Sequence, residues 1–270
     1  MPSPSFAIII PARYESTRFP GKPLAPLAGA SGLRKPLIQR SWECAREVAG
    51  ASDRIWVATD DDRIAEVVEG FGGQVVMTST SCRNGTERCA EAITALGLDV
   101  DIIVNLQGDA PLSPPAIVQD LVKRLADEAD AAMATPAVRC SPTLYRHLED
   151  DAANGRVGGT TVVFDRASRA LYFSKRMIPY LPDRAASANA IPMFLHLGMY
   201  AYRPQALVDY LAATPSILEE VEGLEQLRFL DIGLPVSVMQ MDPLGWDSIE
   251  LNNPSDVGGI ERILAERGIA

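Results

Sequence analysis

A short apolar segment near the start of the chain leads directly into a loop that cannot be helical. Phe6 to Ile10 is apolar and largely β-branched, which is typical of the first strand of a buried parallel sheet. The loop after it holds residues that exclude an early helix: Pro11, Pro20, Gly21 and Pro23. Because open α/β sheets bind ligands beyond the carboxyl ends of their strands, this loop is a candidate ligand site.

The alternation of short strand and amphipathic helix continues through the first half of the chain. Apolar residues at helical spacing predict helices, and short runs rich in Val and Ile predict strands. Helices are expected at 36–48, 64–71, 86–96 and after Pro115, and strands at 54–59, 74–77, 101–106 and 131–138. This order predicts an α/β fold with a doubly wound, mostly parallel central sheet flanked by helices.

The second half departs from that alternation. Residues 140–159 are polar and end in two glycines, so we expect a surface excursion there. Strands are expected at 160–165, 169–174, 194–202 and 236–241, and helices at 205–213, 217–230 and 254–267. We expect one domain of residues 1–270 with a continuous sheet, in three parts at 1–138, 139–245 and 246–270.

Composition narrows the classes of function. The formal charge of −10 argues against a general nucleic-acid surface, so a basic loop on this chain should serve a small ligand. No segment approaches the roughly 20 apolar residues of a membrane span, and the first residues do not resemble a signal peptide, which favours a cytoplasmic protein with no membrane partner. The 4 cysteines show no CxxC pairing and only 2 histidines are present, so no zinc site is expected.

Three cations on the first loop suggest a polyanionic ligand. Arg13 and Arg18 offer planar donor forks to phosphate oxygens, and Lys22 offers a compact ammonium group. Gly21 allows a close approach of the backbone. The sequence therefore predicts triphosphate binding, although the loop is neither a P-loop nor a GxGxxG motif. The alternative is a solvated basic loop.

Asp109 and Asn252 are candidate metal ligands. Asp109 follows a buried strand in VNLQGDAPL, where a carboxylate can hold Mg²⁺ against a triphosphate. Asn252, in NNPSD, offers an oxygen after the last strand. The alternatives are an acidic helix cap for Asp109 and a conformational preference for turns at Asn252.

Two further groups of polar residues could bind substrates. Thr86, in the NGTER segment, and Gln107 could contact a ribose or a pyrimidine edge, while a plain helix cap is the alternative for Thr86. In the second half, several polar residues stand in otherwise apolar segments and suit an acidic polyhydroxylated acceptor. These are Lys175, His196, Tyr200, Glu225 and Gln226. Taken singly, each could equally be a surface residue or a satisfied buried one.

Seven segments together resemble one enzyme family. They are RYESTRFPGKPL, VATDDDRI, GTER, VNLQGDAPL, ALYFS, HLGMYAYR and LEQLR, and the resemblance spans most of the chain. In this order and spacing they resemble the 3-deoxy-manno-octulosonate (Kdo) cytidylyltransferases. The resemblance implies a Rossmann-like nucleotidyltransferase fold, a homodimer, Mg²⁺ as cofactor, and transfer of CMP from CTP to an acidic sugar with release of pyrophosphate. It also implies a place in lipopolysaccharide biosynthesis.

The resemblance also assigns residue roles. It places nucleotide binding on Ala12, Arg13, Arg18, Lys22, Thr86 and Gln107, and acceptor binding on His196, Tyr200, Glu225 and Gln226, with Lys175 beside them. It places the magnesium-binding aspartate on Asp109. Asn252 is kept as a second metal ligand because the related sugar-phosphate uridylyltransferases use an Asn on magnesium at the corresponding turn. Arg13, Lys22 and Asp109 are the expected catalytic residues. Part 139–245 would then carry acceptor binding and dimerisation.

Three positions depart from the family pattern. Asn252 stands where the family has a metal-binding Asp, with Asp247 and Glu250 as further carboxylates nearby in sequence. Lys175 replaces an Arg, and Thr161 replaces a Lys. We therefore also expect, as alternatives, a cytidylyltransferase for another nonulosonic acid, an amino-modified Kdo or a phosphonate, or a catalytically weak nucleotide-binding homologue.

Overall fold

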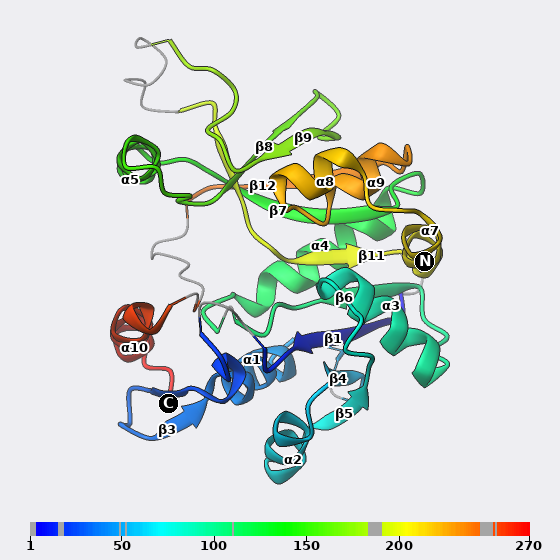
Figure 1. Ribbon diagram of the computed structural model, residues 1–270, viewed down its shortest axis with the longest axis vertical. Coiled ribbons are helices and arrows are strands. Elements are labelled where there is room, and N and C mark those ends of the chain that lie inside the picture. Colours follow the sequence, from blue (N-terminus) through cyan, green and yellow to red (C-terminus); the bar gives the residue numbers. More distant parts are fainter. Residues whose placement is uncertain are drawn as a thin grey trace. The chain divides into compact units, whose positions relative to one another are not determined.

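The computed structural model describes residues 4–15, 19–48, 50–51, 53–109, 111–182, 191–243, 251 and 253–270 (Figure 1). The chain divides into two compact units, of residues 1–122 with 245–270 and of residues 123–244. The first boundary falls within helix α4 (Pro115–Asp127). The three-part division at residues 138 and 245 stays a prediction. In the described part of the chain, no helix has the length and apolar character that crossing a membrane requires.

The first unit contains four parallel strands in the order β5, β4, β1, β6 (Figure 1). They are β1 (Phe6–Ala12), β4 (Ile55–Thr59), β5 (Gln74–Met77) and β6 (Ile102–Asn105). Three helices pack against these strands: α1 (Leu37–Arg46), α2 (Asp62–Gly70) and α3 (Gly85–Leu96). Helices α1 and α3 contact the apolar central strand β1, whose Ile8, Ile9 and Ile10 are fully buried, whereas α2 packs on β4 and β5. The parallel α/β order predicted for this half is confirmed.

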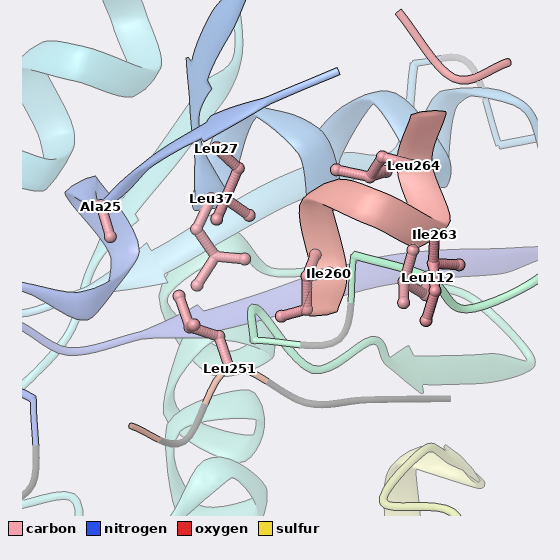
Figure 2. Close-up of a cluster of buried hydrophobic side chains, with 8 residues drawn as sticks. All are labelled: Ala25, Leu27, Leu37, Leu112, Leu251, Ile260, Ile263 and Leu264. Atoms are coloured by element: carbon pink, nitrogen blue, oxygen red, sulfur yellow. The ribbon is translucent and has the colours of Figure 1, made fainter. Parts of the chain in front are cut away.

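A second apolar cluster holds the C-terminal helix in the same unit. The chain after β1 forms a 3₁₀ turn, η1 (Lys22–Leu24), and a hairpin of β2 (Pro26–Ala28) and β3 (Arg34–Pro36). Near the C-terminus, η2 (Pro254–Asp256) leads into α10 (Val257–Glu266). Figure 2 shows Ile260 and Leu264 of α10 beside Leu27 and Leu37, in the cluster that also contains Leu251. This contact fixes the backbone that leaves η1.

The second unit is built around β7 (Met133–Arg139), which has paired strands along both of its edges. On one edge β12 (Val236–Met241) runs parallel to it. On the other edge lie the antiparallel strands β10 (Phe194–His196) and β11 (Tyr200–Tyr202). Beyond β10 follow β8 (Thr160–Phe164) and β9 (Ala170–Ser174). The helices are α5 (Pro142–Ala153), α7 (Pro204–Ala212), α8 (Ile217–Glu222) and α9 (Leu227–Asp231).

The structure corrects three expectations in this unit. The polar excursion begins with helix α5, because Ser141 caps its N-terminus and the side chains of Tyr145 and Leu148 are buried in a small apolar cluster. The expected helix 217–230 is two helices, since Gly223 adopts a left-handed conformation that ends α8. The expected strand 194–202 is also two strands, β10 and β11, interrupted between His196 and Tyr200.

Candidate functional site

A cavity of about 220 Å³ opens at the carboxyl ends of the parallel strands of the first unit. Three segments line it: the end of β1 with the loop after it, the start of α3, and the loop after β6. The polar and small residues that these segments contribute to the lining are Ala12, Arg13, Lys22, Asn84, Gly85, Arg88, Gln107, Gly108 and Asp109. The structure therefore brings together five of the residues predicted from sequence to bind the nucleotide or the metal. Arg18 lies outside the described residues.

The conformation of the basic loop after β1 depends on Tyr14, whose ring packs between the backbone of Gly21 and the side chain of Arg63. Gly21 has φ +69°, and a Cβ on it would lie 3.1 Å from the Tyr14 ring. The Gly21 N–H donates to the Tyr14 carbonyl at 2.9 Å, and the Arg63 guanidinium stacks 3.3 Å from the centroid of the Tyr14 ring. Any side chain at Gly21 would both strain the backbone and displace Tyr14. The loop therefore presents Lys22 from a fixed backbone.

Lys22 and Asp109 form an ion pair inside the cavity. The Lys22 Nζ lies 2.5 Å from Asp109 Oδ2, and both side chains are partly exposed, at 17% and 24%. Arg13 also lines the cavity, is exposed, and has no ion-pair partner among the described residues. The cavity therefore offers Arg13, Lys22 and one carboxylate, besides Arg88, which is paired with Asp60. Cations with a carboxylate are the combination expected for phosphate groups with a divalent cation.

The start of α3 contributes its backbone and a buried arginine. Asn84 accepts a hydrogen bond from the Glu87 N–H at 2.8 Å and caps the helix. Arg88 is 3% exposed, and its guanidinium donates to Asp60 at 2.9 Å and to Thr78 at 2.5 Å. The positive end of the helix dipole favours an anion here. Thr86 is buried within this first turn and does not line the cavity.

The loop after β6 forms the floor of the cavity. At Gly108 a Cβ would lie 2.8 Å from the Pro11 carbonyl oxygen, so only glycine allows these two strand ends to approach so closely. This approach places Gln107 and Asp109 on the same wall as Ala12. Sequence reasoning missed Gly85, Cys82 and Gly108 as lining residues, although the Asn–Gly pair before a helix was a usable signal for the first.

The residues present fit a magnesium ion whose coordination shell would be completed by substrate phosphates. Asp109 is the one carboxylate among the described residues that line the cavity, and no group of three or more His, Cys, Asp or Glu in the described part of the chain is arranged to hold a metal ion by itself. Mg²⁺ usually takes one or two protein carboxylates together with phosphate oxygens and water. Asn252, Asp247 and Glu250 lie outside the described residues, so their part in metal binding stays a prediction.

In the second unit, three of the predicted acceptor residues form one buried cluster. His196, Tyr200 and Gln226 are 8%, 3% and 2% exposed. The Tyr200 hydroxyl donates to Gln226 Oε1 at 3.3 Å, and the rings of His196 and Tyr200 lie 5.5 Å apart. The Gln226 Nε2 is buried and has no hydrogen-bond partner among the described residues. Glu225, next in the chain, is half-buried.

His196 is neutral, and its tautomer follows from its neighbours. Burial lowers the pKa of His196 to about 3. Its Nε2 lies 2.8 Å from Thr135 Oγ1, and that hydroxyl is also 2.8 Å from the Met199 carbonyl oxygen. The single hydroxyl proton of Thr135 is donated to the carbonyl, which can only accept. His196 therefore carries its proton on Nε2, and its Nδ1 is a hydrogen-bond acceptor.

Lys175 lines a different cavity of the second unit, of about 410 Å³. Arg156, Arg176 and Glu222 also line it, whereas His196, Tyr200 and Gln226 do not. Thr161 lines it too, and its hydroxyl donates to the Arg176 carbonyl at 2.6 Å and accepts from the Ile178 N–H at 3.2 Å. The Thr161 side chain thus holds the turn after β9.

The four cysteines are free thiols. Cys82 lines the nucleotide cavity, and burial together with a hydrogen bond to Glu91 raises its pKa to about 12. Burial likewise raises the pKa of Cys44 to about 12 and of Cys140 to about 11. Cys44, Cys82 and Cys140 are therefore protonated at neutral pH and are poor nucleophiles.

Comparisons with known proteins agree with this geometry. The family model described as "Cytidylyltransferase" matches residues 7–239. The chain is 44% identical to a 3-deoxy-manno-octulosonate cytidylyltransferase of Maricaulis maris, covering 98% of both chains. It is 43% identical to one of Vibrio cholerae, covering 97% of this chain and 99% of the relative.

A solved structure shows the same fold. A CMP:2-keto-3-deoxy-manno-octonic acid synthetase in complex with CTP superposes with a TM-score of 0.82 at 33% identity, covering 97% of this chain and 99% of the other. The predicted Rossmann-like nucleotidyltransferase fold is thereby confirmed. With a family model matching most of its length and relatives above 40% identity over nearly all of it, the chain is a nucleotidyltransferase that belongs to the 3-deoxy-manno-octulosonate cytidylyltransferase family.

Proposed function

We propose that this protein transfers CMP from CTP to 3-deoxy-manno-octulosonate, giving CMP-Kdo and pyrophosphate in a magnesium-dependent reaction. The observation that carries this proposal is the cavity that gathers Arg13, Lys22, Gln107 and Asp109 at the strand ends of the first unit. The family supports the choice of nucleotide and acceptor, since the relatives named above carry out this type of transfer by name.

The reaction requires positioning and charge neutralisation rather than a covalent enzyme intermediate. The anomeric hydroxyl oxygen of the acceptor forms a bond to the α-phosphorus of CTP, its proton passes to solvent, and the bond to the β-phosphate bridging oxygen breaks to release pyrophosphate. Arg13 and Lys22 bind the phosphates and stabilise the charge that develops on them. When bound, magnesium would add charge stabilisation at the phosphates, held by Asp109 and, as a prediction, by Asn252.

The acceptor residues supply groups suited to sugar hydroxyls. The Nδ1 of neutral His196 is able to accept a hydrogen bond, and the Gln226 Nε2 is a buried donor without a partner among the described residues. A buried unpaired donor is costly in the free protein and gains a partner when a hydroxyl arrives. Such groups reject analogues that lack the hydroxyl. The acceptor roles of Tyr200, Glu225 and Lys175 remain part of this proposal.

A second acceptor is favoured by one observation. Lys175 lines the 410 Å³ cavity with a compact ammonium group in place of the guanidinium expected from the family pattern. Thr161 stands in place of a second expected cation, and its hydroxyl is already hydrogen-bonded to the backbone. An amino-modified Kdo, another nonulosonic acid or a phosphonate could suit this arrangement better than Kdo. Homodimer formation, a cytoplasmic location and a role in lipopolysaccharide biosynthesis are further parts of the proposal.

A pyrophosphate-release assay tests the proposal. Purified protein with Mg²⁺ is given CTP, UTP, ATP or GTP, each with Kdo and with a panel of other acidic acceptors. We expect turnover only when CTP and an acidic sugar are both present, with CMP-Kdo identified by mass spectrometry. Equal use of CTP and ATP would contradict the pyrimidine assignment. Conversion of another acid with no turnover of Kdo would move the assignment to that acceptor.

A further inference from the structure

Asn105 is a buried polar residue without a structural partner. It is the last residue of β6 and is fully buried, at 0% exposure. Neither its Oδ1 nor its Nδ2 has a hydrogen-bond partner among the described residues. Buried amides are almost always hydrogen-bonded, because an unpaired one loses its contacts with water and gains nothing in return. A residue of this kind directly behind a ligand cavity calls for a functional explanation.

The Asn105 carboxamide lies directly behind the nucleotide cavity. Its Nδ2 is 3.2 Å from the point that a Cβ on Gly85 would occupy, and the Gln107 Nε2 is 3.7 Å from the same point. The two carboxamides therefore flank the first residue of α3. Gly85 and Gln107 line the cavity, whereas Asn105 does not. Asn105 can act on a ligand only through these two neighbours.

The chemistry of the amide groups gives Asn105 a role. A glutamine side chain presents a donor on one side and an acceptor on the other, and a half-turn exchanges them. Gln107 alone could therefore read either cytosine, whose ring N3 accepts a hydrogen bond, or uracil, whose N3–H donates one. Selection requires a group of fixed polarity. The backbone N–H groups at the start of α3 have fixed polarity, since they can only donate; that of Glu87 is already bonded to the Asn84 side chain.

We propose that Asn105 is a positioning residue that fixes the orientation of Gln107 and so makes the site select cytosine over uracil. In the nucleotide complex the Asn105 Oδ1 accepts from the N–H of Gly85, the first residue of α3, and its Nδ2 donates to the Gln107 Oε1. The Gln107 Nε2 is then left to donate to the ring nitrogen of cytosine. This inference rests on the proposed function, because it assumes that the cavity binds the base of CTP.

Substitution of Asn105 separates positioning from a structural role. Leu has a similar size and no polar groups, so Asn105→Leu removes the unpaired amide from the free protein. We expect its Tm to be equal to or above that of the wild type. Asn105→Asp keeps the shape and removes the donor. Ile103→Val is the matched control, because Ile103 is fully buried on the same face of β6 and does not line the cavity.

The readout is the ratio of the Kd values for UTP and CTP, measured by calorimetry with Mg²⁺, together with kcat and KM. We expect both Asn105 variants to lower that ratio by about tenfold or more, because a wrongly oriented or freely turning amide loses its discrimination. The kcat at saturating CTP and the KM for the acceptor should stay within about twofold, since Asn105 contacts neither. Ile103→Val should keep the wild-type ratio.

Two outcomes would overturn the inference. One is an unchanged ratio in both Asn105 variants, which would leave Asn105 as a structural residue. The other is equal loss of discrimination in Ile103→Val, which would assign the effect to general loosening of β6. These results are distinguishable from a failure of the proposed function, in which wild-type protein would bind CTP no better than UTP or ATP.

Discussion

Arg13, Lys22 and Asp109 line their cavity from two loops and a 3₁₀ turn and remain partly exposed. His196, Tyr200 and Gln226 lie on strands or beside a helix and are almost fully buried. The first group is charged and the second is uncharged. A loop can hold charges without removing them from water, so it suits a triphosphate that arrives with its own charge. A buried neutral group has already lost its hydration when the protein folds. If a ligand lacks the matching hydroxyl, that group stays without a hydrogen bond, so the site rejects such a ligand.

The largest expected effect is at Asp109. Asp109→Asn keeps the shape of the side chain but removes the charge that pairs with Lys22 and would hold the metal. We expect kcat to fall by about a hundredfold or more at saturating Mg²⁺ and CTP, as loss of a group that stabilises transition-state charge typically does. Asp101→Asn is the control, because Asp101 precedes the same strand at its other end and bonds Ser5. Near-normal turnover in Asp109→Asn would remove Asp109 from the mechanism.

The buried group should instead dominate the pH dependence of stability. The unfolded His196 takes up a proton below its ordinary pKa of about 6.5, whereas the folded one does not until about pH 3. The stability that this histidine contributes is therefore complete above pH 6.5 and is lost as the pH falls towards 3. By pH 5 the loss should be about 2 kcal/mol in the free energy of unfolding.

Chemical denaturation at pH 7 and pH 5 measures this effect. His196→Gln should lack this part of the pH dependence, although its stability at pH 7 should also change because of the hydrogen bond with Thr135. His147→Gln is the control, because His147 is exposed on α5. If His196→Gln and wild type lose the same stability between the two pH values, then His196 is not held neutral by burial.

A smaller effect is expected where α3 begins. In Gly85→Ala the new methyl group would lie 3.2 Å from the Asn105 Nδ2 and 3.5 Å from the Pro11 Cγ, so the cavity wall has to shift. We expect the KM for CTP to rise by roughly threefold to tenfold, equivalent to about 1 kcal/mol, with an unchanged KM for the acceptor. Gly258→Ala is the matched control, since a Cβ there meets nothing within 4 Å. An effect of equal size on the acceptor KM would show that the two regions are not separable.

The smallest expected effect is at Lys175. A guanidinium holds a carboxylate through two parallel hydrogen bonds, so Lys175→Arg should lower the KM for Kdo by about threefold and leave the KM for CTP unchanged. Steady-state kinetics with each substrate varied in turn measures both constants, and Lys123→Arg on α4 serves as the control. A rise in the KM for Kdo would indicate that the acceptor of this enzyme is not matched to an arginine.

The nucleotide side was the easier one to predict from sequence. A buried strand followed by prolines, a glycine and cations predicts a loop site from local signals alone, and the structure places Arg13 and Lys22 in one cavity with Asp109. The part of the cavity that could not be predicted from the sequence was the wall formed by the start of α3. Asn84 and Gly85 read equally well as an ordinary cap, and only the packing of Gly85 against Pro11 and Asn105 shows that they form the wall.

The second unit was harder because its local signals compete with tertiary packing. The polar run 149–151 concealed the helix α5, whose Tyr145 and Leu148 are buried by residues far along the chain, Ile191 and Met193. The neutral state of His196 depends on burial beside Thr135 and Phe173, which no local pattern encodes. The unpaired amide of Asn105 is likewise a property of neighbours, since the same residue in an exposed strand would be hydrated.

Hydrogen–deuterium exchange with each substrate added alone tests the central claim that nucleotide and acceptor are held by different regions. With CTP and Mg²⁺, the account predicts protection of peptides covering 84–88 and 105–109, and no protection of peptides covering 194–200 and 224–228. With Kdo alone it predicts the reverse. Protection of 194–200 by CTP alone, or no protection at 84–88 and 105–109 at saturating CTP, would contradict the account.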